Sequence, residues 1–151
     1  MVNRPGMGTA EDETFNYVDS LFLEAAVLTG HRQAAELILN RFTGTGISTS
    51  GIYNTTCIPR HLAGAAALLG RFVEARKHFQ EALKICTGMN LRPELALTRL
   101  QLAELLFEHY PRERAEALEH LEFAITEFQE MKMQPSLERA LRQKEMRKAQ
   151  V

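Results

Sequence analysis

The chain has 151 residues and a mass of 17.1 kDa, enough for one globular domain. Hydrophobic residues make up 45% of it and charged residues 25%, which excludes a disordered or collagen-like protein. Because the net charge is only −1, the composition gives no electrostatic reason to expect a nucleic acid or an anionic membrane as partner.

The sequence contains no candidate for a membrane span, because its longest apolar stretch, 62–70, is much shorter than a spanning helix requires. The N-terminal residues lack the apolar core of a secretion signal, and Cys57 and Cys86 lack metal-binding or redox spacing. We therefore expect a cytoplasmic protein without membrane contact, in which each cysteine fills a small buried volume.

Residues 1–13 are poor in apolar side chains and carry an acidic run at 11–13. Such a segment buries too little surface to offset the entropy lost on ordering. We expect a flexible tail over 1–13, followed by a single helical domain over 14–148.

Helical periodicity begins at Phe15. Apolar residues recur every three or four positions from Phe15 to Ala26 and again from Ala34 to Phe42, with Gly30 between the two runs. Residues 43–56 are mostly Gly, Ser and Thr, and they predict a mobile connection without a phosphate-binding lysine. The first helix pair is therefore expected within 14–43.

Prolines mark the remaining helix starts. Each stands just ahead of an apolar-periodic run, where its missing N–H costs nothing because the donors of a first helical turn are unpaired anyway. The four prolines are Pro59, Pro93, Pro111 and Pro135. Together with a stop near Gly88 they predict helices over 58–69, 71–86, 91–109, 111–131 and 135–148. No segment alternates polar and apolar residues as a strand would, so the expected fold class is all-α.

Three stretches of the sequence repeat one another, at 30–42, 70–82 and 112–124. Their alanines Ala35, Ala75 and Ala117 hold equivalent places, 40 and 42 residues apart. The repeat predicts helical hairpins over 14–43, 57–87 and 91–131. Helix 135–148 has a narrow apolar stripe among charges, which is typical of a cap.

The middle copy, RHLAGAAALLGRFVEARKHFQEAL, resembles a tetratricopeptide repeat (TPR). Leu62, Gly70, Ala75 and Phe79 supply the roles of that pattern, although there is no Trp and Thr87 replaces the usual Pro. Residues 57–148 also resemble the C-terminal repeat region of large bacterial signal-transduction ATPases and of adenylate or guanylate cyclases. The resemblance implies a right-handed α-solenoid of about three hairpins plus the cap, acting as a regulatory or docking piece.

The sequence shows no constellation of residues suited to catalysis. No two histidines are spaced as metal ligands, and neither cysteine has an identifiable base. We therefore expect no enzymatic activity, no cofactor and no metal. The histidines are His31, His61, His78, His109 and His120.

Stacked hairpins place their first helices on a concave side, where such scaffolds bind a peptide or a partner helix. Counting from the packing positions predicts that a protein or peptide partner contacts a groove lined by Tyr17, Ser20, Glu24, Arg60, Gly64, Leu100 and Glu104. Three alternatives stay open. These residues simply face solvent, the end hairpins pair in a homodimer, or a small-molecule sensor pocket lies between hairpins.

Overall fold

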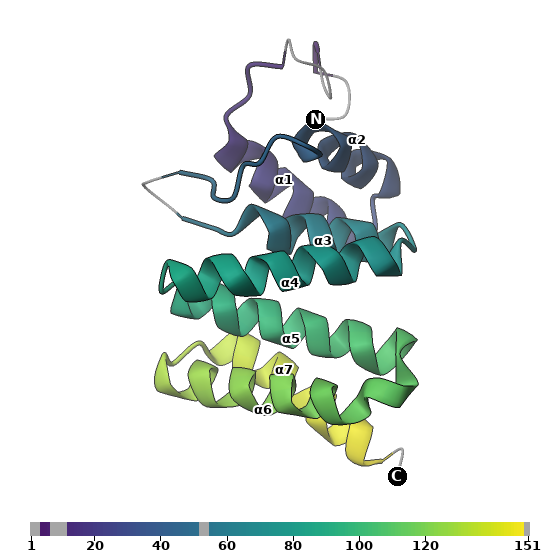
Figure 1. The fold of residues 1–151 in the computed structure, drawn as a ribbon, viewed down its shortest axis with the longest axis vertical. Coiled ribbons are helices and arrows are strands. Elements are labelled where there is room, and N and C mark those ends of the chain that lie inside the picture. The colour runs from purple at the N-terminus through teal and green to yellow at the C-terminus, as the bar shows by residue number, and fades with distance from the viewer. Residues whose placement is uncertain (1–3, 7–11, 52–54, 150–151) are drawn as a thin grey trace. The chain divides into compact units, whose positions relative to one another are not determined.

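The computed structural model describes residues 4–6, 12–51 and 55–149 (Figure 1). Within these ranges every regular element is helical: α1 Asn16–Thr29, α2 Arg32–Phe42, α3 Ile58–Leu68, α4 Phe72–Gly88, α5 Arg92–His109, the 3-10 helix η1 Pro111–Glu113, α6 Arg114–Glu130 and α7 Gln134–Lys148. The all-α prediction is confirmed. Residues 1–3 and 7–11 of the expected tail, and 52–54 of the expected loop, lie outside the described residues. None of the helices in the described ranges is long and apolar enough to span a bilayer.

Proline positions agree with the sequence prediction. Pro59, Pro93, Pro111 and Pro135 each lie within the first two residues of a helix, namely α3, α5, η1 and α7. At these places the ring removes an N–H that has no partner inside the helix, and its fixed φ suits the first turn.

Four of the interhelical turns share one backbone geometry. A residue with positive φ ends the helix, and the amide that follows donates to the carbonyl five residues earlier, as in a Schellman cap. The four bonds are His31 N to Ala26 O at 2.8 Å, Arg71 N to Ala66 O at 2.8 Å, Leu91 N to Cys86 O at 2.9 Å and Met133 N to Phe128 O at 2.9 Å.

Glycine occupies the positive-φ position in two of these turns, at Gly30 and Gly70, where the sequence predicted helix ends. In the other two the residue is Asn90 or Lys132. The predicted stop near Gly88 is therefore displaced by two residues, because Gly88 is still helical and Asn90 adopts the left-handed conformation.

The contacts between Cα atoms divide the chain into two compact units, Met1–Ala82 and Leu83–Val151, with the boundary inside α4. In the first unit α1 packs against both α2 and α3. In the second unit α6 packs against both α5 and α7, and Leu100, Leu121 and Phe128 lie in its core.

Residues that repeat in the sequence are core residues in the structure. The three anchoring alanines, Ala35, Ala75 and Ala117, have no exposed surface. The residues four and seven positions after them are buried too: Leu39, Phe42, Phe79, Ala82, Leu121 and Ala124. Small residues at the anchors allow two helix backbones to approach closely, and the larger side chains fill the space beside them.

The connection between α2 and α3 contains backbone hydrogen bonds between residues that are not neighbours in the chain, which the sequence did not predict. The amide of Ile58 donates to the carbonyl of Ser48 at 3.0 Å, and the amide of Ser50 donates to that of Thr56 at 3.2 Å. Thr49 and Cys57 form an isolated antiparallel bridge. Residues 48–50 are therefore held against residues 56–58, where α3 begins.

Candidate functional site

The predicted groove residues of the first unit do not form one exposed surface. Tyr17 is partly exposed on α1, but the side chain of Ser20 is fully buried and its hydroxyl donates to the carbonyl of Tyr17 at 2.7 Å. The expectation that Ser20 faces a partner has to be corrected, because an inward serine next to its own backbone has neither space nor a spare donor for a ligand.

Glu24 and Arg60 do lie close to each other, across α1 and α3. Their side chains form an ion pair at 3.8 Å, with Arg60 buried and Glu24 about half exposed. Arg60 Nη2 also lies 3.2 Å from His61 Nε2, and Thr56 Oγ1 lies 2.7 Å from the same nitrogen. The predicted exposure of Arg60 is wrong, because this guanidinium lies inside the unit among polar partners.

Gly64 faces a neighbouring helix. A Cβ built on Gly64 would lie 3.7 Å from both γ-methyl carbons of Val27, which is ordinary van der Waals contact. Gly64 therefore lies between α3 and α1, and it is only partly accessible.

The two predicted groove residues of the second unit are also occupied within the chain. Leu100 has no exposed surface and belongs to the core cluster of α5, α6 and α7. Glu104 accepts two hydrogen bonds from Arg139 of α7, at 2.8 and 2.5 Å. The assignment of Leu100 to an open surface is corrected in the same way as that of Ser20.

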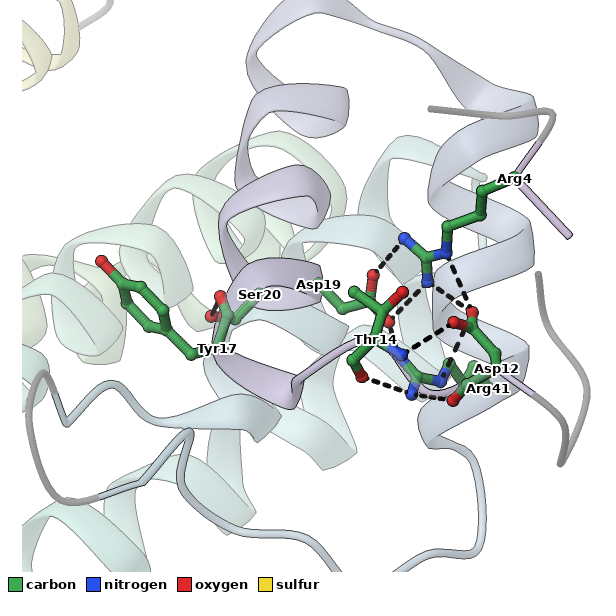
Figure 2. A network of polar contacts seen from close by, with 7 residues as sticks. All are labelled: Arg4, Asp12, Thr14, Tyr17, Asp19, Ser20 and Arg41. Atoms are coloured by element: carbon green, nitrogen blue, oxygen red, sulfur yellow. Dashed lines mark hydrogen bonds and ion pairs between the residues drawn. The ribbon is translucent and has the colours of Figure 1, made fainter. Parts of the chain in front are cut away.

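A buried cluster of opposite charges lies at the start of the first unit (Figure 2). This Arg–Asp cluster consists of Arg4, Asp12, Asp19 and Arg41. Asp19 projects from α1 and Arg41 from α2, while Arg4 and Asp12 belong to the segment expected to be a tail. Both aspartates are almost completely buried.

Each arginine of the Arg–Asp cluster reaches both carboxylates. Arg4 Nη2 donates to Asp12 Oδ2 at 2.5 Å and to Asp19 Oδ2 at 2.8 Å. Arg41 forms ion pairs with Asp19 and Asp12, and its Nη2 donates to the carbonyls of Asp12 and Thr14, both at 2.7 Å. The cluster ties residues 4 and 12 to the first two helices.

Electrostatics in the Arg–Asp cluster favour the charged form of Asp12. The pKa of the Asp12 carboxyl is held well below its usual range, chiefly by the hydrogen bond from Arg4, with further lowering by Thr14 and Arg41, while burial acts in the opposite direction. Two positive and two negative charges balance, and every carboxylate has a guanidinium partner. The arrangement stabilises the fold and leaves no group poised as an acid, a base or a nucleophile.

In the second unit a partly buried histidine lies against an arginine. Arg99 Nη1 is 3.2 Å from His120 Nδ1, and the Arg99 guanidinium stacks 4.1 Å from the ring centre of Phe123. Burial lowers the pKa of His120, and the charge on Arg99 lowers it further, while Glu116 at 3.7 Å acts in the opposite direction. The neutral imidazole is therefore favoured.

The surface feature that stands out is one face of α1. Tyr17, Leu21, Ala25 and Leu28 recur at intervals of four, four and three residues and are all exposed. We call these four residues the α1 outer face. Leu21 is 45% exposed and Leu28 is 75% exposed, and Glu24, whose side chain is 44% exposed, lies beside them on the same side of α1. Figure 2 shows the Tyr17 side chain pointing away from the Arg–Asp cluster.

The exposed face of α2, which packs against α1, is polar instead. The exposed residues of α2 include Arg32, Gln33, Glu36 and Asn40, which are the charged and polar side chains expected on a solvated helix face. Single exposed apolar residues are common on proteins, whereas contiguous apolar patches are found at many interaction sites.

Sequence reasoning identified one member of the α1 outer face, Tyr17, and missed the others. The periodicity of α1 assigns Phe15, Val18, Phe22, Ala25 and Ala26 to the packed side. Ala26 is buried as predicted, but Phe15 and Ala25 are exposed, and the other buried residues of the helix are Asp19, Ser20 and Leu23. The sequence did contain a signal for an exposed apolar face, because α1 is apolar on more of its circumference than one packing face requires.

Comparisons of the chain with protein-family models, with curated proteins and with solved structures gave no match. Among the described residues no group of three or more His, Cys, Asp or Glu side chains is placed to bind a metal ion.

Proposed function

We propose that the protein is a non-catalytic protein-binding scaffold, and that it presents the α1 outer face to an amphipathic helix or peptide. The observation that carries the proposal is the apolar, solvent-exposed stripe of Tyr17, Leu21, Ala25 and Leu28, beside which the half-exposed Glu24 is paired with the buried Arg60. The TPR-like repeats at 30–42, 70–82 and 112–124 support it, because proteins with such repeats usually act by binding. The sequence resemblance adds a regulatory or docking role in a signalling system.

The chemistry of the α1 outer face suits helix-in-groove recognition. In that mode a partner buries apolar anchors at helical spacing, and hydrophobic burial supplies the free energy of binding. Leu21 and Leu28 would act as the anchors. Tyr17, at the N-terminal end of the stripe, combines an apolar ring with a hydroxyl that suits a rim exposed to water.

The proposal differs from the sequence-based groove in its location. Ser20 and Leu100 are fully buried, Arg60 is nearly so, and Glu104 is paired with Arg139, so these residues do not offer a common accessible surface. Tyr17 belongs to both descriptions. The binding role therefore rests on α1 alone and does not depend on how successive hairpins stack.

A photo-crosslinking amino acid placed at Leu28 tests the proposal in cells that express the full chain. We expect a discrete crosslinked product from position 28 that is lost, by roughly tenfold or more, when Leu21→Glu is introduced on the same face. The matched control places the crosslinker at Asn40 on the polar face of α2 and should give no discrete product. Equal products from positions 28 and 40, or no effect of Leu21→Glu, would overturn the proposal.

A further inference from the structure

One charged side chain, that of Glu24, accompanies the α1 outer face. Glu24 follows Leu21 by three residues and precedes Leu28 by four, so the three side chains lie on the same side of the helix. Leu21 and Leu28 are about 10.5 Å apart along the helix axis, and Glu24 is near the middle of that span. A partner that covers both leucines therefore also covers the Glu24 carboxylate.

The ion pair with Arg60 leaves the Glu24 carboxylate open to a second partner. The two side chains are 3.8 Å apart, which is longer than a hydrogen bond. Arg60 is 3% exposed, whereas the side chain of Glu24 is 44% exposed, so water still reaches Glu24. A purely apolar partner would displace this water without replacing it, at a cost to affinity. A cation on the partner replaces it instead.

The exposed charges on α1 and just before it are all negative. Glu13 is exposed and Glu24 is half-exposed, while α1 itself contains no Lys or Arg. Beyond the other end of α1, Arg32 donates to the carbonyls of Leu68 and Leu69 and is therefore directed at the end of α3. The arginines that pair with residues of α1 are mostly or fully buried: Arg4, Arg41 and Arg60. An approaching segment therefore meets apolar side chains and carboxylates, which favours a positively charged partner.

We propose that the partner of the α1 outer face is a basic amphipathic helix, with two apolar residues seven positions apart and a Lys or Arg three or four positions after the first. This inference rests on the proposed binding role of the face and names the chemistry of the partner. The apolar pair covers Leu21 and Leu28, and the cation reaches Glu24 whichever way the partner helix runs. Lys and Arg suit this place, because their methylene stems pack on apolar surface while the charged end reaches a carboxylate.

Selection of displayed helical peptides against the full chain tests the proposal. The library keeps two leucines seven positions apart and randomises the positions between them. We expect Lys or Arg three or four positions after the first leucine to be enriched about threefold, the factor expected for one partly exposed ion pair. Selection against Glu24→Gln should remove this enrichment. Selection against Glu36→Gln, the matched change of a half-exposed carboxylate on α2, should retain it. Equal amounts of Lys or Arg before and after selection on wild type overturn the basic partner.

A measurement on the unchanged protein separates a lost contact from lost folding. It compares a selected lysine peptide with a counterpart in which glutamate replaces that lysine, by fluorescence anisotropy. Wild type should bind the lysine peptide about tenfold more tightly, and the difference should shrink as the salt concentration rises. Glu24→Lys should reverse the preference. Equal Kd values of the two peptides for wild type overturn the proposal.

Leu21→Glu distinguishes failure of this inference from failure of the proposed function. If the selected peptides show no preference for a cation but lose binding to Leu21→Glu, the basic partner is refuted while the binding role of the α1 outer face stands. If Leu21→Glu binds the selected peptides as tightly as wild type does, or if no peptide is selected, both proposals fail.

Discussion

At the residue scale, the most consequential side chain of the first unit is Asp19. It is a carboxylate with no exposed surface, and two arginines that are themselves mostly buried, Arg4 and Arg41, neutralise it. Removal of one partner from such a buried group leaves the others without compensation, which costs far more than the intact pairing contributes.

Asp19→Asn keeps the shape of the side chain and removes its charge. We expect it to lower the free energy of unfolding by about 3 kcal/mol, because Arg4 and Arg41 then share only Asp12. Urea denaturation measures the change.

The matched control is Glu36→Gln, which breaks the 2.5 Å ion pair between Glu36 and Arg71. Both side chains of that pair are more than a third exposed, so water screens their attraction and the loss should be below about 1 kcal/mol. Equal effects of the two substitutions would contradict a stabilising role of the Arg–Asp cluster.

His120 gives a prediction about pH. Its pKa is lowered in the folded chain, chiefly by burial and then by the charge on Arg99, so the unfolded chain binds more protons as the pH falls below the ordinary histidine value of about 6.5. Stability should therefore decrease as the pH is lowered through that value, and the contribution of His120 is fully present above it.

Two measurements check this pH prediction. The imidazole of His120 should titrate by NMR below the ordinary histidine value of about 6.5. His120→Gln should also flatten the loss of stability between about pH 7 and pH 5. A His120 that titrates above the ordinary value would reverse the sign and refute the interpretation.

At the element scale, the turns test how helix ends are specified, because the same capping geometry recurs at Gly30, Gly70, Asn90 and Lys132. Gly70 has a φ of 80°, where a side chain is strained, while Gly64 lies inside α3 with ordinary space around a new Cβ. The two glycines should therefore respond to alanine in opposite ways.

We expect Gly70→Ala to lower the free energy of unfolding by about 1 kcal/mol, because a Cβ is disfavoured in the left-handed region. Gly64→Ala should raise it by up to about 1 kcal/mol, since alanine has the higher helix propensity and gains contact with Val27. Thermal or urea unfolding distinguishes the two signs, and a stabilising Gly70→Ala would contradict the cap.

Helix starts and ends could be predicted wherever a single residue type has a specific local backbone requirement. Pro59 and Pro93 indicate helix starts through a missing N–H, and Gly30 and Gly70 indicate ends through their tolerance of positive φ. The sequence-based prediction placed the end of α4 near Gly88 and missed the left-handed residue Asn90, because asparagine does not require that conformation. The end of α6 near residue 131 was predicted, but the left-handed conformation of Lys132 was not, for the same reason.

For the molecule as a whole, the amino-acid sequence predicts the helices and their order, because proline, glycine and the spacing of apolar residues act over one or two turns. It also identified the buried anchors Ala35, Ala75 and Ala117 through their repetition. Tertiary structure alone decided which side of each helix meets water, because an error of one residue rotates a helical position by about 100° and buries Ser20 and Leu100. It alone joined Arg4 to Asp19 as well, since attraction between charges 15 residues apart leaves no periodic trace in the chain.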